Sequence, residues 1–235
     1  MKLLEKEKRN IWIRQVATTS NIPITEPTED GIFSPAFSPS GDFLYYLVNK
    51  KETNKSDLYQ ITTLGGTQRM IREHVYSKLA FSPDGKQIAF LRDSLEIEYQ
   101  LIIADLNGMN ETIVCRRKIP NHFDDLSWSP DGSTIALIDG TSGNFLNHRV
   151  MLFSISDRKE TILPNQQWLS LTSVNWLANG KGLIVTAADH QSSFDSRQIW
   201  FVPYPTGEPR RITNDMNDYF YTTVDGRSTS MAALA

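Results

Sequence analysis

Short apolar runs recur along this chain at nearly regular intervals, and each begins just after a turn that contains glycine. The four clearest runs cover residues 43–48, 88–91, 135–138 and 183–186. Their length is typical of strands rather than helices. Because no charged residue interrupts them, they resemble strands that are covered on both faces. The pattern therefore predicts four buried strands, each in the middle of its own sheet.

A five-residue motif precedes each apolar run and defines an internal repeat. Three copies are intact, a fourth is degraded, and a fifth keeps only its last two residues. In chain order they are Phe37-Ser38-Pro39-Ser40-Gly41, Phe81-Ser82-Pro83-Asp84-Gly85, Trp128-Ser129-Pro130-Asp131-Gly132, Trp176-Leu177-Ala178-Asn179-Gly180 and Asp225-Gly226, with Thr222 at the aromatic position of the last. Successive glycines lie 44, 47, 48 and 46 residues apart. This spacing indicates one four-stranded propeller blade per repeat.

The motif also predicts its own local structure. Its aromatic residue ends a strand, and proline stops that strand because it cannot donate to a ladder hydrogen bond. Asp-Gly then supplies the positive backbone angles of a tight hairpin. The aromatic side chains at this position, Phe37, Phe81, Trp128 and Trp176, are expected in the core between blades.

A second hairpin follows each buried strand. Its two strands are expected at residues 57–61 with 68–71, 100–105 with 112–114, 149–155 with 160–163, and 198–202 with 210–213. The sequence thus predicts an all-β protein, a β-propeller of four-stranded antiparallel blades. We expect one domain over residues 1–235, with whole blades at about 30–72, 73–116, 121–163 and 168–213.

The two ends of the chain are expected to carry parts of blades. Residues 10–25 resemble an outer hairpin, and residues 219–234 resemble an inner pair of strands. The two parts could join into a fifth blade and close a ring. Alternatively, the chain is an interior piece of a larger propeller, which we favour because the Ala232–Ala235 ending is poor strand material.

Composition and charge exclude several classes of protein. The hydrophobic content of 40% and the charged content of 22% are ordinary for a folded domain. A net charge of −3 gives no support to a nucleic-acid partner. Cys115 is the only cysteine, so disulfides within the chain and multi-thiolate zinc sites are excluded. We find neither a signal peptide nor an apolar stretch of transmembrane length, so we expect a soluble chain with no membrane insertion of its own.

No familiar catalytic signature is present, and we expect no catalytic residue, cofactor or metal site. Residues 140–143 have neither the spacing nor the setting of a nucleophile elbow. The four histidines are His74, His122, His148 and His190. A metal cluster would require them to converge with carboxylates, and we interpret them as ordinary histidines of loops or of the rim. Asp124 and Asp125 are adjacent, so their side chains should point to opposite faces of a strand.

The remaining polar groups have structural interpretations. Asp215, Asn217 and Asp218 lack the full calcium-loop pattern and are expected to cap a turn. The basic runs at 116–118 and 210–211 are expected to guard outer strands against edge pairing. Cys115 is expected to be a small buried hydrophobic residue.

Specific segments resemble known propellers. The pattern Phe-Ser-Pro-Asp-Gly-x-x-Ile-Ala-Phe at residues 81–90 resembles the WD-like repeats of TolB-type propellers. The segments at 11–21, 58–67 and 198–219 resemble the carboxyl-terminal propeller of bacterial eukaryotic-like serine/threonine protein kinases. That resemblance implies a sensor or interaction region outside the membrane, separate from the kinase domain, since the chain contains no kinase motif.

The sequence therefore favours a non-catalytic module that binds a protein or peptide partner. Propellers present loops at both rims, where partners can dock without any chemistry. Two alternatives remain: the propeller of a prolyl-oligopeptidase-like peptidase, and a free-standing TolB-like periplasmic binding protein. Sequence beyond either end of the chain would distinguish them, through a kinase catalytic loop upstream or a Gly-x-Ser-x-Gly motif downstream.

Overall fold

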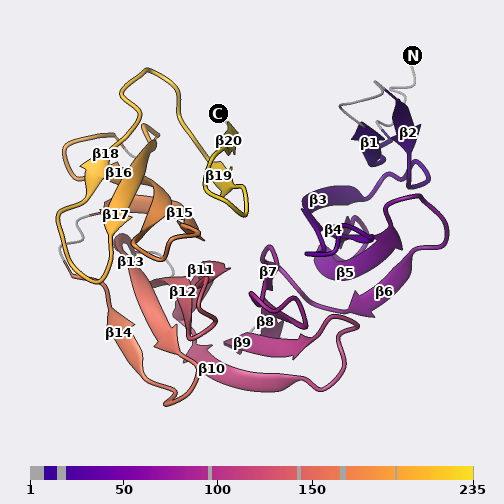
Figure 1. The fold of residues 1–235 in the computed structure, drawn as a ribbon, viewed down its shortest axis with the longest axis horizontal. Coiled ribbons are helices and arrows are strands. Elements are labelled where there is room, and N and C mark those ends of the chain that lie inside the picture. Colours follow the sequence, from indigo (N-terminus) through magenta and orange to yellow (C-terminus); the bar gives the residue numbers. More distant parts are fainter. Residues whose placement is uncertain are drawn as a thin grey trace. The chain divides into compact units, whose positions relative to one another are not determined.

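The structure is a computed structural model that describes residues 8–14, 20–94, 97–141, 144–164, 168–193 and 195–234. It consists of antiparallel sheets, four with four strands and two with two strands (Figure 1). The chain divides into two compact units, Met1–Leu79 and Ala80–Ala235. The predicted all-β class with four-stranded antiparallel blades is confirmed.

The first unit contains a two-stranded and a four-stranded sheet. The strands are β1 (Trp12–Arg14), β2 (Asn21–Pro23), β3 (Gly31–Phe37), β4 (Phe43–Lys50), β5 (Lys55–Thr62) and β6 (Arg69–Arg72). Its core gathers Ile24, Leu44, Tyr46 and Ile61, all of them buried. Because Ile24 directly follows β2, this cluster packs the small sheet against the larger one.

The second unit contains three four-stranded sheets and a two-stranded one. Their strands are β7 (Ala80–Phe81), β8 (Gln87–Ser94), β9 (Glu98–Asp105) and β10 (Thr112–Lys118); β11 (Asn121–Trp128), β12 (Thr134–Thr141), β13 (Asn144–Ser154) and β14 (Glu160–Ile162); β15 (Trp168–Trp176), β16 (Gly182–Asp189), β17 (Gln198–Pro203) and β18 (Arg210–Arg211); and β19 (Tyr221–Val224) with β20 (Met231–Leu234). Every strand pairs with its neighbour in the sequence, as in the blades of a propeller. Within the described part of the chain, no helix is long and apolar enough to cross a membrane.

The predicted apolar runs form the second strand of each four-stranded sheet, and they are buried. In β12, residues 135–138 are completely inaccessible. One hydrophobic cluster contains Ala136 and Val150 from the sheet β11–β14 together with Val174 and Val185 from the sheet β15–β18. Neighbouring sheets therefore pack face to face, which explains why these strands lack the alternation of a half-exposed sheet.

The repeated motif forms the turn between the first and second strands. In the third copy, the Ser129 hydroxyl donates to Asp131 (2.6 Å) and accepts from the Thr134 amide (2.9 Å). The Gly132 amide donates to the Ser129 carbonyl (3.0 Å), and Gly132 has a φ of 77°, which favours glycine. The second copy repeats the arrangement with Ser82, Asp84 and Gln87, so the motif specifies a closed turn.

The aromatic residue of the motif is buried in two copies, half-buried in the copy with Phe81 and exposed in the copy with Phe37. Trp128 and Trp176 are 9% and 8% exposed, as predicted. Phe37 is 55% exposed, so the expectation that it lies in a core between blades is wrong. The buried cluster of its own unit gathers Ile24, Leu44, Tyr46 and Ile61 and does not include Phe37.

Side chains of one sheet accept hydrogen bonds from backbone amides on the edge strand of the next sheet. The amides of Val174 and Trp176, on the edge strand β15, donate to Asp125 and to the Ser127 hydroxyl of β11, both at 2.9 Å. The Thr222 amide of β19 likewise donates to the Ser173 hydroxyl of β15 (3.3 Å). β11 therefore caps backbone amides of β15, and β15 caps one of β19.

We predict that Asp125→Ala destabilises the protein much more than Asp124→Ala. Asp125 is 4% exposed, and its removal leaves the buried amide of Val174 without this acceptor. The free energy of unfolding should fall by about 1–3 kcal/mol. Asp124 is exposed and, among the described residues, pairs only with the half-buried His122 and His148, so its removal should lower the free energy of unfolding by no more than about 1 kcal/mol. Denaturant unfolding followed by circular dichroism measures both, and equal losses would contradict the capping role.

Candidate functional site

Two histidines and one carboxylate converge on the sheet β11–β14. Nε2 of His122 lies 3.2 Å from Oδ2 of Asp124, and Nε2 of His148 lies 3.4 Å from the same oxygen. The side chains of His122 and His148 are 14% and 8% exposed, whereas that of Asp124 is 38% exposed. We call these three residues the histidine cluster. It is half enclosed by protein and reaches solvent through its carboxylate.

The order of the strands explains why the two imidazoles meet. His122 lies on β11 and His148 on β13, on either side of β12. In the register of β11 with β12, Gly140 is the partner of His122. A Cβ atom on Gly140 would stand 2.5 Å from Nε2 of His148 and 3.2 Å from Nε2 of His122. Glycine is therefore required at this position because the two rings occupy the space above it.

A β-bulge separates the two adjacent aspartates. The pairing of β11 with β12 shifts between Phe123 and Leu126, so β11 carries one extra residue there. Asp124 stays on the face of His122, two residues away, while Asp125 turns toward the next sheet and accepts from Val174. The two carboxylates therefore have different tasks, one in the cluster and one between the sheets.

The two histidines have different electrostatic environments. The hydrogen bond to Asp124 raises the pKa of His122, and a further hydrogen bond from its ring reaches Pro120, which can offer only a backbone carbonyl. Burial lowers the pKa of His148. His148 is therefore held as the neutral imidazole, and His122 is oriented by partners on both sides.

A second charged group lies beside the cluster. Asp139 on β12 accepts from Arg117 at 2.7 Å and from Arg149 at 3.0 Å. Arg117 also donates to Glu160 at 2.7 Å, and it is only 17% exposed. The prediction that the run 116–118 is a solvent-exposed guard is therefore wrong for Arg117. This side chain links β10 to the following sheet because two carboxylates of that sheet, Asp139 and Glu160, compensate its buried charge.

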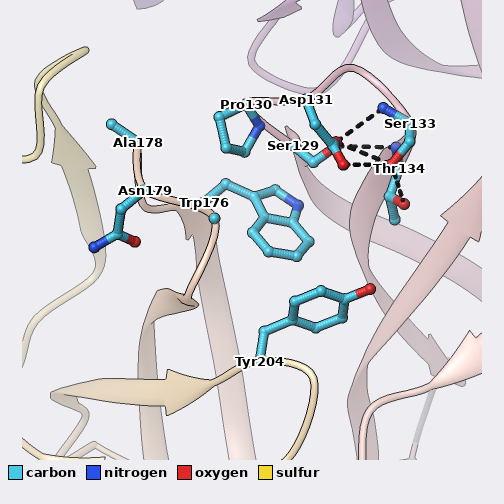
Figure 2. A pocket seen from close by; sticks show the side chains of 10 residues that line it. Ser129, Pro130, Asp131, Ser133, Thr134, Trp176, Ala178, Asn179 and Tyr204 are labelled. Atoms are coloured by element: carbon cyan, nitrogen blue, oxygen red, sulfur yellow. Dashed lines mark hydrogen bonds between the residues drawn. The ribbon is translucent and has the colours of Figure 1, made fainter.

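A groove of about 420 Å³ lies between the sheets β11–β14 and β15–β18. Its walls are the motif turns at residues 129–134 and 176–180, and Tyr204 lines it as well. Figure 2 shows the indole of Trp176 between Pro130 and the ring of Tyr204. The two aromatic rings meet edge to face with their centroids 4.9 Å apart. We call this hollow the Trp176 groove.

The equivalent tryptophans of two successive repeats differ in one hydrogen bond. Nε1 of Trp128 donates to the carbonyl of Gly132, four residues on, at 3.1 Å. Nε1 of Trp176 is buried and has no acceptor among the residues that the structure describes. In the degraded copy, Leu177 and Ala178 replace the serine and proline of the motif. The repeat with the altered turn is therefore also the repeat in which the tryptophan N–H group, beside the groove, has no acceptor among the described residues.

The structure separates the other candidates from the cluster. His74 belongs to the first unit, where its amide donates to Asp57 (3.2 Å), and His190 is exposed in a turn. Asp215 caps a turn as expected, since it accepts from the Asn217 amide (3.0 Å) and the Tyr219 hydroxyl (2.7 Å). Asp218 pairs with Arg197. Of the four histidines, the structure thus brings only His122 and His148 together within the described residues.

Sequence reasoning missed Gly140 and Tyr204. Gly140 belongs to no repeat, and its role depends on the register of three strands, which a single sequence does not give. Tyr204 follows β17, far from the motif that lines the groove with it. The available signal was the interruption of the apolar strand at 135–138 by Asp139 and Gly140, both of which are buried.

The comparisons with known proteins identify the fold. No known family model matches the chain. TolB from Acinetobacter baumannii is 17% identical over 89% of this chain and 50% of its own, with a TM-score of 0.70. A chain of the nidogen/laminin complex is 11% identical over 94% of this chain and 81% of its own, with a TM-score of 0.69. A prolyl endopeptidase is 16% identical over 83% of this chain and 29% of its own, with a TM-score of 0.59.

These similarities show that the chain has a TolB-like β-propeller fold. At such identities they concern the fold alone. The chain spans half the length of the TolB structure and less than a third of the prolyl endopeptidase.

We predict that the thiol of Cys115 reacts very slowly with thiol reagents in the folded protein. Burial raises its pKa to about 12, and the side chain hydrogen-bonds to Glu160 (3.0 Å). Because the thiolate is the reactive form, the reactive fraction should be roughly a thousandfold below that of an ordinary cysteine. Release of the chromophore from Ellman's reagent measures the rate. Denatured protein is the control, and equal rates in the two states would contradict the prediction.

Proposed function

We propose that this chain is a non-catalytic propeller domain that binds a protein or peptide partner through the Trp176 groove. The observation that carries the proposal is the buried indole N–H of Trp176, which has no acceptor among the described residues. A buried donor without a partner is unfavourable by about 1–3 kcal/mol. Because this N–H group is closed to solvent, a partner would have to part the walls of the groove and place an acceptor against it. Binding in this way would remove the penalty, so the donor favours a bound state.

The chemistry of the groove suits a peptide. A polypeptide offers a carbonyl acceptor at every residue, and its apolar side chains can pack on the ring of Tyr204, which is 36% exposed and contacts Trp176. Tryptophan and tyrosine are also enriched among the residues that dominate binding energies at protein interfaces. Pro130 is exposed on the same wall and adds apolar surface.

The acidic group of the groove favours binding over catalysis. Asp131 accepts from the hydroxyl groups of Ser129 and Ser133. The hydrogen bond from Ser129 lowers the pKa of Asp131, so the group stays ionised and is a poor general base near neutral pH. Its serine neighbours donate to it in the turn and have no histidine to activate them among the residues that line the groove.

We further propose that the domain belongs to a bacterial serine/threonine kinase and acts as its interaction region. The support is the resemblance of residues 11–21, 58–67 and 198–219 to the propellers of such kinases. The fold neighbour from a prolyl endopeptidase favours the alternative, a propeller that accompanies a peptidase domain. The gene upstream and downstream of this chain decides between them. A kinase catalytic loop supports the first, and a serine nucleophile elbow supports the second.

We predict that Trp176→Phe weakens peptide binding while the protein stays folded. The probe is an immobilised library of capped decapeptides, and retained peptides are measured individually by fluorescence anisotropy. Phenylalanine keeps the aromatic surface but removes the N–H group. Loss of one hydrogen bond to a peptide carbonyl should weaken binding by about fivefold to tenfold. The melting temperature should fall moderately, because Trp176 belongs to the buried core and the smaller ring leaves a cavity there.

The matched control is Trp128→Phe. It removes the same N–H group at the same motif position in the preceding repeat. There the group already donates a hydrogen bond to the carbonyl of Gly132 within the fold. This variant should keep the wild-type affinity and lose about 1 kcal/mol more stability than Trp176→Phe, because it also removes a hydrogen bond within the fold. Equal binding by wild type and Trp176→Phe, or no retained peptide at all, would refute the groove as the binding surface.

A further inference from the structure

The histidine cluster has the dimensions of a metal site. Tetrahedral coordination at about 2.0–2.1 Å from the metal places neighbouring ligand atoms about 3.3–3.4 Å apart. In the cluster, the two nitrogen–oxygen separations are 3.2 and 3.4 Å. The three potential ligand atoms all lie within 4.8 Å of one another. The ligand atoms therefore need only small shifts to contact one common ion.

The backbone holds the three ligands in place. His122 and Asp124 are two residues apart on β11 and share a face, and His148 reaches them from β13. The strand between them contributes Gly140, where any side chain would collide with His148. The rings of His122 and His148 stand nearly perpendicular, at 84°, with their centroids 5.7 Å apart. All the ligands come from the strands of one sheet, which makes the arrangement more rigid than a set of loop residues.

We propose that His122, Asp124 and His148 bind a divalent transition-metal ion, of which Zn²⁺ fits the donor set best. Two imidazole nitrogens and one carboxylate oxygen are ligands typical of zinc sites, whereas Ca²⁺ and Mg²⁺ require mainly oxygen ligands. The hydrogen bond from the His122 ring to Pro120 matches the outer-shell support that usually orients a metal-bound histidine.

The surrounding charges leave Asp124 available for the metal. The nearby Asp139 is compensated by Arg117 and Arg149, which occupy its two oxygens at 2.7 and 3.0 Å. Asp124 reaches solvent, with 38% of its side chain exposed. The site therefore supplies three protein ligands and leaves a fourth position on the solvent side for water.

The bound ion would join β11 to β13 across β12. Two strands that are not adjacent would gain a direct link, so the folded protein should be stabilised by the metal. This role goes beyond partner binding at the Trp176 groove, and the two sites involve different residues.

The experiment measures Zn²⁺ binding to chelator-treated, dialysed protein by isothermal titration calorimetry. Wild-type protein should bind one equivalent and show a higher melting temperature with Zn²⁺. Co²⁺ replaces Zn²⁺ as a spectroscopic probe, because four-coordinate Co²⁺ with nitrogen and oxygen ligands gives much stronger visible absorption than the hexaaqua ion. That spectrum reports coordination geometry and does not depend on any activity.

Asp124→Asn and His148→Gln test the ligands. Asp124→Asn keeps the shape of an exposed side chain and should weaken Zn²⁺ binding by about tenfold to a hundredfold. His148→Gln removes a buried ligand and should weaken it at least as much. Gly140→Ala should do the same while keeping all three ligands, because its methyl group displaces His148. Circular dichroism establishes that each variant is folded.

The matched controls are His74→Gln and His190→Gln, which remove the histidines outside the cluster. Both should bind Zn²⁺ and Co²⁺ like the wild type. The proposal is overturned if wild-type protein binds no stoichiometric Zn²⁺, or if folded Asp124→Asn and His148→Gln bind as well as the controls. Trp176→Phe should leave Zn²⁺ binding unchanged, so this site and the groove can fail independently.

Discussion

The structure of the second unit depends on side chains of β11 and β15 that accept hydrogen bonds from the edge strand of the following sheet. A first strand has backbone amides on its outer side that no ladder reaches, and such an edge is normally prone to unwanted pairing. Here Asp125 and Ser127 accept from the amides of Val174 and Trp176, and Ser173 accepts from Thr222. The same contacts align successive sheets, which lets Val150 and Val174 pack in one core.

The strands and turns could be predicted because their causes are local. Proline, aspartate and glycine in the motif specify the turn, and an unbroken apolar run such as 135–138 specifies a strand buried on both faces. The histidine cluster could not be predicted, since it depends on the register of β11, β12 and β13 and on the bulge after Phe123. The role of Arg117 could not be predicted from the sequence either, because its partners Asp139 and Glu160 lie on the following sheet.

The degraded fourth copy of the motif shows how a repeat can acquire an individual property. Gly132 and Gly180 both keep a positive φ, and both turns close through the amide of their glycine. The turn conformation therefore tolerates the loss of serine and proline. What changes is the environment of the tryptophan, which is satisfied internally in one repeat and left with an unused donor in the next.

The pairing of every strand with its sequence neighbour also bears on how the chain folds. Contacts within a sheet span short stretches of sequence, so each sheet can form early and alone as the chain emerges during synthesis. The contacts that cap β15 join residues 49 positions apart and can form only when two finished sheets meet. Cooperativity in the second unit should therefore reside at the junctions between sheets, as it does between neighbouring units of other repeat proteins.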